Sequence, residues 1–440
     1  MRWTATEIAA AVEGRLVGAD VTIDRVTQDS REIAPADGHW LFVPLIAERD
    51  GHDFVPAALD AGAVATLASL PVDAGDAAVI EVGSTDSALT ALGAAARDRL
   101  GDAAVVGITG SVGKTTTKDL LAAVLRRDRP THANVRSFNN EIGVPLTLLG
   151  AADGTRAVVL EMGARGIGHI ATLCAPARPT VGIVTTVGAA HTSEFGSVEA
   201  VAVGKGELVE ALPSAGFAVL NADNPLVASM ADRTDAAVVT FGAAGQVRAE
   251  GVSVTADLVP SFRLVSPWGD AEVRLGVQGD HLIPNALAAA AAALSLGVSL
   301  DDVAAGLGEP ERSPMRMAVQ TSPAGARVID DTYNANPLSV AGALDALSAV
   351  PADRRIAVLG VMAELGESSG ADHERMVALA TAHGIQVVAV DAAEYGDGAI
   401  HVADIDAALE VLGRPTGDTA VLVKGSRVAG LERLVARLVG

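Results

Sequence analysis

Cysteine, aromatic residues and long apolar runs are scarce or missing in this chain of 440 residues. Cys174 is the only cysteine, which excludes an intramolecular disulfide and a zinc site made of several cysteines. Aromatic residues make up 3% of the chain, too few to suggest platforms on which nucleic-acid bases stack. No apolar run approaches the roughly 18 to 20 residues of a membrane span, and the N-terminal segment carries Glu7 and Glu13 instead of the apolar core of a signal peptide. We therefore expect a cytoplasmic protein without membrane spans.

Positive charge is also in short supply, because 54 acidic residues outnumber 32 basic ones and give a net charge of −22. A field of this sign repels nucleic-acid backbones, so we expect no nucleic-acid partner. Only four of the basic residues are lysines, and three of these lie beside glycine, in VGKTTT, VGKGE and VKGSR. A chain that otherwise uses arginine could retain lysine where arginine cannot do the same chemistry, although a bias in base composition would leave the same pattern. The four are Lys114, Lys118, Lys205 and Lys424.

The spacing of apolar residues divides the chain into three expected domains, 1–100, 101–310 and 311–440. The first mixes short strands with helices, including one that Ser84 can cap. From residue 103 onward, near-continuous Val, Ile and Leu runs alternate with helical patterns, which is typical of parallel strands covered on both faces. Alternation of apolar and polar residues between about 245 and 278, with SPWGD as a turn, predicts a small antiparallel sheet.

Strand–helix units return after the segment GEPERSP, which reads as a linker. They predict a Rossmann-like domain, although the dinucleotide fingerprint GxGxxG is missing from them. The expected fold class is therefore α/β, with a small α/β N-terminal domain, a central parallel-sheet domain that carries the antiparallel sheet, and a Rossmann-like C-terminal domain.

The strongest local signal for chemistry is the segment VVGITGSVGKTTTKDLL. A buried strand ends, glycines form a turn and Lys-Thr-Thr begins a helix, so that backbone N–H groups and a helix N-terminus can face a phosphate. Lys114 would reach the β- and γ-phosphates and the Thr115 hydroxyl would bind Mg²⁺, the alternative being a capping turn with a surface lysine. Lys118, one turn further, is expected on a solvated face. The residues expected to bind nucleotide in this segment are Gly110, Ser111, Val112, Gly113, Lys114, Thr115 and Thr116.

The loop differs from two related motifs, and these differences reduce the number of nucleotide-binding protein classes that fit the sequence. Ile108 stands where the full GxxxxGK[ST] motif has its first glycine, so the motif is GxxGKTT. None of the four lysines follows an asparagine, so the Asn-Lys-x-Asp motif that reads a guanine base is missing, which argues against a GTPase.

Three further side chains are candidates for the same site. Glu161 ends the apolar run AVVLE, where a carboxylate can bind Mg²⁺, and a solvated acid at a strand end is the alternative. His191 follows another buried strand, and could bind a metal or be a structural histidine. Lys205, if desolvated, could lose its proton and take up CO₂ to give a carbamate, whereas the alternative is a helix-surface ion pair with Glu207 or Glu210.

These segments belong to a series of motifs that occur in the order found in Mur ligases, and the chain resembles that family over essentially its whole length. YNANP most specifically points to the members that add D-alanyl-D-alanine, while the DNPR signature of the tripeptide-forming members is missing from the C-terminal region. The segment DSR with GHDF is similar to the family's nucleotide-sugar recognition region. The other motifs are GxxGKTT, SFNNEIGVP, LEMGA, GAAHTSEFGS, VGKGE, GDHLIPNALAA, SPMRM, AELGE and LVKGSR.

The resemblance implies an ATP-dependent amide ligase that adds D-alanyl-D-alanine to UDP-N-acetylmuramoyl-tripeptide through an acyl phosphate, acting as a monomer. It implies ATP, two Mg²⁺ ions and a CO₂-derived carbamate on Lys205 as cofactors. The N-terminal domain would recognise the UDP-sugar, the central domain would bind ATP, and the C-terminal domain would close over ATP and bind D-alanyl-D-alanine. The implied metal ligands are Thr115, Glu161, His191 and Lys205.

The same resemblance assigns individual contacts. Asn285 is expected at the adenine, Asp331 at the ribose and Arg316 at the nucleotide phosphates. The side chains implied in catalysis are Lys114, Glu161, His191, Lys205 and Arg316. Those expected to contact the peptide and sugar substrates are Ser30, Arg31, Asn140, Asn334 and Asn336.

Two alternatives and one departure accompany this interpretation. The chain could instead be another ligase of the superfamily, such as the tripeptide-forming Mur ligase or a folylpolyglutamate synthase, or a nucleotide-gated binding module without turnover. Val361 stands where the family has an acid, which could weaken a contact to the incoming dipeptide or to the hinge.

Overall fold

The computed structural model describes residues 1–135, 138–188, 192–311 and 313–440. The chain divides into two compact units. The first consists of Met1–Gly107, Arg129–Gly163 and His169–Val181, and the second of Ile108–Asp128, Ala164–Gly168 and Gly182–Gly440. No helix in the described part of the chain is both long and apolar enough to cross a bilayer. The domain boundaries expected at residues 100 and 310 stay a prediction.

The N-terminal part of the first unit is built on a five-stranded sheet with the order β2-β7-β6-β5-β4. Only β2 and β7 pair antiparallel in it. Thr4 caps α1 (Ala5–Ala11) in a capping box with Glu7. Ser84 caps α3 (Thr85–Arg99), as predicted. The strands are β2 (Arg15–Val17), β4 (Arg25–Thr27), β5 (Trp40–Phe42), β6 (Ala63–Ala68) and β7 (Ala78–Glu81), and α2 (Val55–Asp60) lies between β5 and β6 in sequence.

The predicted parallel sheet has six strands in the order β13-β12-β11-β8-β10-β9. The pairs β9–β10 and β12–β13 are parallel, and every residue of β10 and β11 is buried, as continuous apolar runs predict. Its strands are β8 (Ala104–Thr109), β9 (Thr131–Ala133), β10 (Ala157–Glu161), β11 (Val181–Val184), β12 (Phe217–Asn221) and β13 (Ala237–Phe241). The helices between them are α4 (Lys114–Asp128), α5 (Gly143–Gly150), α6 (His169–Ala177), α7 (Thr192–Phe195), α8 (Val198–Glu210) and α9 (Pro225–Ala228).

Two helices from later in the chain, α10 (Ile283–Ser295) and α11 (Leu300–Gly308), pack against α4. The alanines of α10 are fully buried, which lets the two helix backbones approach closely. A Cβ atom added to Gly306 of α11 would lie 2.5 Å from Cα of Val124. Lys118 of α4 is 4% exposed and pairs with Asp119 at 2.9 Å. The expectation of a solvated Lys118 was therefore wrong, because residues on all sides of α4 are buried.

The alternating segment near residue 250 forms the predicted antiparallel sheet of three strands, β14 (Arg248–Val254), β15 (Pro260–Ser266) and β16 (Gly269–Arg274). Ser266 pairs with Gly269 across the hairpin, so SPWGD is the turn that the sequence predicts.

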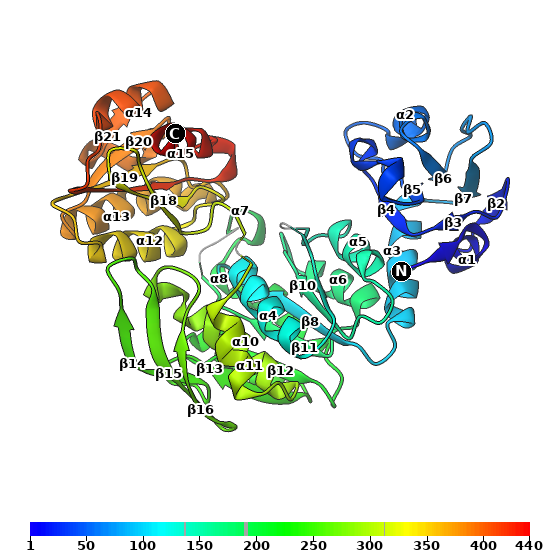
Figure 1. Cartoon of the computed structure of the whole chain (residues 1–440), viewed down its shortest axis with the longest axis horizontal. Coiled ribbons are helices and arrows are strands. Elements are labelled where there is room, and N and C mark those ends of the chain that lie inside the picture. The colour runs from blue at the N-terminus through cyan, green and yellow to red at the C-terminus, as the bar shows by residue number, and fades with distance from the viewer. Residues whose placement is uncertain (136–137, 189–191, 312) are drawn as a thin grey trace. The chain divides into compact units, whose positions relative to one another are not determined.

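The C-terminal region carries a second six-stranded sheet, in the order β17-β18-β22-β19-β20-β21. β17 forms an antiparallel hairpin with β18, and the remaining neighbours are parallel. Figure 1 shows α12 (Pro337–Ala349) and α13 (Ser369–Ala382) on one face of this sheet and α14 (Ile405–Leu412) and α15 (Glu432–Val439) on the other. The strands are β17 (Ala318–Thr321), β18 (Arg327–Asp331), β19 (Arg354–Leu359), β20 (Gln386–Val390), β21 (Ile400–Val402) and β22 (Thr419–Lys424).

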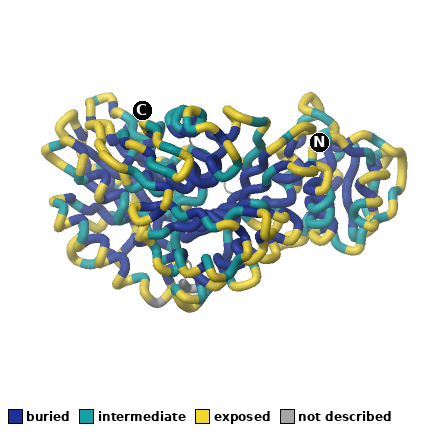
Figure 2. The backbone as a smooth tube through the Cα atoms, turned by 90° about the horizontal axis from the view of Figure 1, so that it is seen from below, coloured by how far each residue is buried: buried dark blue, intermediate teal, exposed yellow. Residues whose placement is uncertain are grey.

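Successive residues of β19 enter different cores of this Rossmann-like region. Ala357 and Leu359 belong to the core that includes residues of α12 and α13, whereas Ile356 and Val358 belong to the core that includes residues of α14 and α15. This period of two on a strand buried on both faces confirms the doubly covered sheet. In Figure 2 buried residues lie mainly in the interior of the tube, and exposed residues lie mainly at its outer turns.

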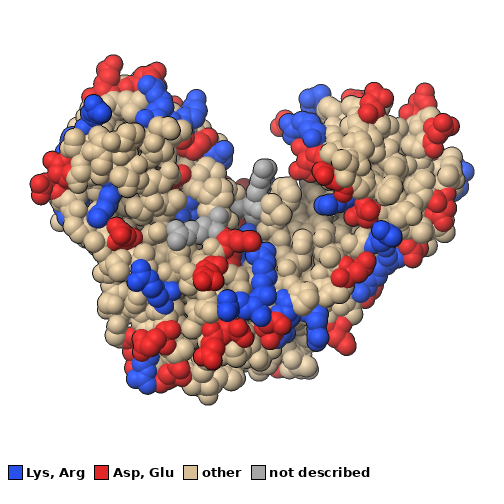
Figure 3. All heavy atoms as spheres, in the orientation of Figure 1, with Lys and Arg blue, Asp and Glu red and all other residues tan. Residues whose placement is uncertain are grey.

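Acidic and basic side chains lie close together on the face shown in Figure 3. Arg126, near the end of α4, pairs with Glu311 at 2.8 Å, and Arg127 pairs with Asp302 at 3.5 Å. Pairs of this kind are exposed and screened by solvent, so they add little to stability.

Candidate active site

The Gly-Lys-Thr-Thr turn leads from β8 into α4, as the sequence predicts. Gly110 and Gly113 have φ values of 148° and 85°, which is the region of backbone space that favours glycine. The Lys114 ammonium donates to the carbonyl of Gly110 at 2.8 Å, so its side chain folds back over the turn. Ser111, Val112 and Thr116 lie in the turn and the first turn of α4. A strand, a glycine turn and a helix N-terminus thus follow one another, as in loops whose N–H groups bind an anion.

Asn285 of α10 supports this turn from the side. Its amide nitrogen donates to the carbonyl of Gly113 and to Oγ1 of Thr117, both at 3.1 Å. A Cβ atom on Gly113 would lie only 2.1 Å from that nitrogen. Glycine at this position therefore allows α10 and the turn to touch.

Thr185 is a supporting residue that was not predicted from the sequence. It follows β11 directly, and its hydroxyl donates to the carbonyl of Val112 at 2.6 Å. A Cβ atom on Gly110 would lie 1.9 Å from the same hydroxyl oxygen. Ser111 N–H donates to the carbonyl of Thr186 at 2.8 Å. The signal in the sequence was a pair of hydroxyl residues directly after a buried strand, which ends in the same crevice as the phosphate loop.

Lys205 lies on α8 and is 1% exposed. Burial lowers the pKa of its ammonium group well below the ordinary value, and the positive charge of Lys114 lowers this pKa further. The helix-surface ion pair considered as an alternative is wrong, because Lys205 is inside the protein. Glu210 is held by Arg233 at 2.9 Å, and Glu207 accepts the N–H of Gly168 at 2.5 Å.

Glu161 ends β10 in the first unit and is 2% exposed, so it is not a solvated acid at a strand end. Its Oε1 accepts a hydrogen bond from the side-chain amide of Asn139 at 2.8 Å, and its own N–H donates to Oδ1 of Asn134 at 2.9 Å. Asn140, the residue predicted from this motif, has Oδ1 directed to the N–H groups of Ile142 and Gly143 at the start of α5. Asn139, the neighbour that contacts the carboxylate, was thus not predicted from the motif.

His191 lies outside the residues that the structure describes. Ser30 and Arg31, also in the first unit, form a short 3-10 helix that follows β4. Asp29 caps this helix, and the guanidinium of Arg31 makes hydrogen bonds of 2.8 and 2.6 Å to its two carboxylate oxygens. The Arg31 side chain is 87% exposed, so it is accessible to a ligand.

Arg316 connects the C-terminal region to the phosphate loop within the second unit. Its Nη2 donates to Oγ1 of Thr115 at 3.1 Å, and its guanidinium carbon lies 4.0 Å from the centre of the Tyr333 ring. Nε of Arg316 is buried without a hydrogen-bond partner among the described residues. A buried N–H of this kind needs an acceptor, which a bound anion would supply.

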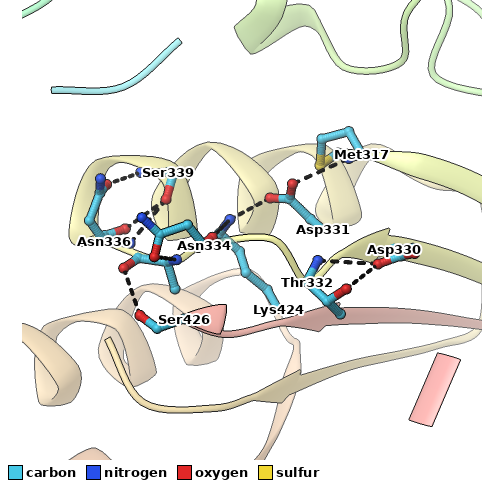
Figure 4. Close-up of polar contacts among 10 residues, drawn as sticks. Met317, Asp330, Asp331, Thr332, Asn334, Asn336, Ser339, Lys424 and Ser426 are labelled. Carbon is cyan, nitrogen blue, oxygen red and sulfur yellow. Dashed lines mark hydrogen bonds and ion pairs between the residues drawn. The ribbon is translucent and has the colours of Figure 1, made fainter. Parts of the chain in front are cut away.

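Asp331 and Lys424 form a buried ion pair at the ends of the neighbouring strands β18 and β22. Figure 4 shows the Lys424 ammonium between the Asp331 carboxylate and the backbone carbonyl of Asn334, which it reaches at 2.8 Å. Burial lowers the pKa of Lys424, while the Asp331 charge opposes this shift. Asn336 caps α12 through the N–H of Ser339. Asp331, Asn334 and Asn336 are thus brought into one cluster.

The loop after β19, which carries Val361, keeps its shape through other groups. The N–H of Ser426, in the LVKGSR motif, donates to the Val361 carbonyl at 3.0 Å, and its hydroxyl accepts the N–H of Ala363 at 2.9 Å. Nε2 of His373 accepts the N–H of Met362 at 2.9 Å. The backbone of this loop is therefore fixed without an acidic side chain at position 361.

Known proteins place this geometry in a family. A model of the Mur ligase middle domain matches residues 108–293, and one of the Mur ligase, glutamate ligase domain matches residues 315–427. The UDP-N-acetylmuramoyl-tripeptide–D-alanyl-D-alanine ligase of Mycobacterium tuberculosis is 42% identical, over 99% of this chain and 97% of that protein. MurF from Acinetobacter baumannii has a similar structure, with a TM-score of 0.90 and 30% identity over 100% of this chain and 99% of its own.

A MurF ligase from Thermotoga maritima, solved in complex with ADP, is also similar, with a TM-score of 0.81 and 29% identity over 94% of this chain and 96% of its own. These likenesses extend over the N-terminal, central and C-terminal regions together. The chain therefore belongs to the Mur ligase family.

Proposed function

We propose that this protein uses ATP to join D-alanyl-D-alanine to UDP-N-acetylmuramoyl-tripeptide, with ADP, phosphate and the UDP-linked pentapeptide as products. Residues 1–100 would bind the UDP-sugar, residues 101–310 would bind ATP, and residues 311–440 would close over ATP and bind the dipeptide. Support comes from the full-length similarity to ligases of that name and from a MurF relative that binds ADP.

The single observation that carries this proposal is the contact between Arg316 and Thr115. Thr115 belongs to the first turn of α4, next to the expected phosphates, and Arg316 comes from the region after the linker. A positive group from the C-terminal region thus reaches the place where phosphoryl transfer would occur. This arrangement suits an enzyme that shields a reactive intermediate from water by closing over it.

The reaction has to activate a carboxylate, because an amine cannot expel oxide from it. The terminal carboxylate of the tripeptide would attack the γ-phosphorus of ATP, the bond from that phosphorus to the bridging oxygen would break, and ADP would leave. The amine of D-alanyl-D-alanine would then attack the acyl phosphate and release phosphate. Lys114, the loop N–H groups and Arg316 would stabilise the negative charge that accumulates on the phosphoryl oxygens.

The donor groups fit Mg²⁺, which prefers hard oxygen ligands. The Thr115 hydroxyl and the Glu161 carboxylate are of this kind, and Asn139 fixes the Glu161 carboxylate through a hydrogen bond. His191, the further ligand that the family suggests, lies outside the described residues. Two bound Mg²⁺ ions would supply positive charge to the transferring phosphoryl group.

Lys205 fits this site once it has lost its proton. Its burial and the charge of Lys114 favour the neutral amine. The lone pair of that amine would form a bond to the carbon of CO₂, one C–O π bond would become an anionic oxygen, and a proton would leave the nitrogen. The resulting carbamate replaces a buried neutral amine by an anionic oxygen ligand for Mg²⁺.

The amine substrate that the enzyme accepts distinguishes the proposed activity from those of related ligases. We expect phosphate release from ATP in the presence of UDP-N-acetylmuramoyl-tripeptide only when D-alanyl-D-alanine is added, measured by a coupled assay with product analysis by mass spectrometry. Release with a lone diamino acid or with glutamate would instead assign the chain to the tripeptide-forming ligases or to the folylpolyglutamate synthases. ATP binding without turnover on any acceptor would support a binding module.

Gly113→Ala tests the nucleotide loop. The added methyl group would displace Asn285 and break its two hydrogen bonds, each worth about 1 kcal/mol, so we expect affinity for a non-hydrolysable ATP analogue to fall about tenfold or more. Calorimetric titration measures this affinity.

The matched control for that variant is Gly154→Ala. Gly154 has nearly the same φ, 83°, but a Cβ atom there would meet nothing within 4 Å. It therefore shares the backbone strain without the collision. Equal nucleotide affinities of the two variants would contradict the role of the Gly113–Asn285 contact.

A further inference from the structure

Arg316 is held by an aromatic ring as well as by its hydrogen bond. The face of Tyr333 lies 4.0 Å from the guanidinium carbon, a distance at which the ring attracts a cation. Tyr333 is half-buried and follows Asp331, the last residue of β18, by two positions. The position of the Tyr333 ring is therefore fixed by the end of strand β18.

The backbone around Arg316 is fixed by the same segment. Met315 and Met317, its two neighbours, have positive φ values of 60° and 48°, a conformation that persists only where the surroundings enforce it. The N–H of Tyr333 donates to the carbonyl of Met315 at 3.3 Å, and the N–H of Met317 donates to Oδ1 of Asp331 at 3.2 Å. Figure 4 shows the second of these contacts beside the Lys424 pair.

A long arginine side chain would otherwise sample many rotamers, and the phosphoryl group needs its donors at one place. Of these donors Nη2 already binds Thr115, and the buried Nε has no partner in the described part of the chain. The Tyr333 ring restricts the plane of the guanidinium and thereby the directions in which Nη2 and Nε of Arg316 donate.

We propose that Tyr333 is a positioning residue that aims the Arg316 guanidinium at the first turn of α4. It acts through Arg316 and its aromatic face, and its hydroxyl is dispensable for this role. The inference rests on the proposed function for its kinetic readout, but its nucleotide-binding readout does not require the peptide substrates.

The kinetic test compares Tyr333→Leu with Tyr333→Phe. Losing the ring should lower kcat about tenfold with a smaller change in the KM for ATP, whereas Tyr333→Phe should retain most of the turnover because its ring also attracts the cation. Tyr333→Met serves as a second ringless variant, and thermal unfolding of each shows that it is folded. A Phe variant as impaired as the Leu variant would overturn the proposal.

The decisive measurement is a double-mutant cycle with Arg316→Lys, whose compact ammonium lacks the planar guanidinium. Tyr333→Leu should weaken binding of a non-hydrolysable ATP analogue in the native background and have little further effect in the Arg316→Lys background. Additive losses would overturn the inference. If the native protein releases no phosphate with D-alanyl-D-alanine, the proposed function fails, while this calorimetric cycle still decides the role of Tyr333.

Discussion

Lys205→Ala is expected to lower kcat by about a thousandfold, a loss typical of removing a group that stabilises transition-state charge. The variant removes the only side chain proposed to convert a buried amine into an anionic metal ligand. The methyl group of alanine fits inside the space of the buried lysine stem, so we expect the variant to fold. Steady-state turnover with saturating substrates measures the loss, and thermal unfolding reports whether the variant is folded.

Two controls separate a carbamate from a simple positive charge at position 205. Lys205→Arg should be as inactive as Lys205→Ala, because a guanidinium does not take up CO₂. A short-chain carboxylic acid such as formate should restore part of the turnover of Lys205→Ala by supplying the missing anionic oxygens. An active Arg variant, or an Ala variant with native turnover, would contradict the proposed chemistry.

Lys424→Met is expected to lower the free energy of unfolding by about 3 to 5 kcal/mol, because it leaves the carboxylate of Asp331 buried without its counter-charge. Lys424 is 2% exposed and Asp331 is 8% exposed, so solvent does not replace the lost partner. The carbonyl of Asn334 loses a donor in the same variant. Urea unfolding monitored by circular dichroism measures the change.

The double variant Lys424→Met/Asp331→Asn should recover part of this loss, since no unpaired charge remains in it. Arg437→Ala is a control in the same region, because it breaks the exposed pair with Asp406 at 54% and 76% side-chain exposure and should cost far less. A Lys424→Met variant no less stable than Arg437→Ala would show that the buried pair is not a stabilising element.

Lys205 and Lys424 are equally enclosed but have opposite electrostatic surroundings. A cation, Lys114, lies near Lys205 and favours its neutral form, whereas an anion, Asp331, holds Lys424 and opposes its deprotonation. Burial alone therefore does not define the chemistry of a lysine in this chain. The sign of the nearest charge separates a reactive amine from a structural ammonium.

The local parts of the fold could be predicted because short-range physics determines them. Ser84 caps a helix, SPWGD turns a hairpin, and the glycines at 110 and 113 take backbone conformations that favour glycine. The strand–turn–helix pattern supplied the phosphate loop and the candidates Glu161, His191 and Lys205, whereas the resemblance to a family supplied the remaining candidate residues of the site.

The contacts that support those residues could not be predicted from spacing. Asn285 reaches Gly113 across 172 positions of the chain, and Thr185 reaches Val112 across 73. Lys118 was wrongly predicted to be exposed to solvent, because the helices that enclose α4 come from residues 283–308, far along the chain. Long-range packing of this kind leaves no periodic signal near the residue that it affects.

The alanine-rich helix α10 limits the substitutions that this protein can accept during evolution. Its small side chains set the spacing to α4, and that spacing brings Asn285 within reach of the nucleotide loop. Any larger residue on the contact face would push the two helices apart and move the loop's support with them. A helix that takes no part in the chemistry thus limits which substitutions the protein can tolerate.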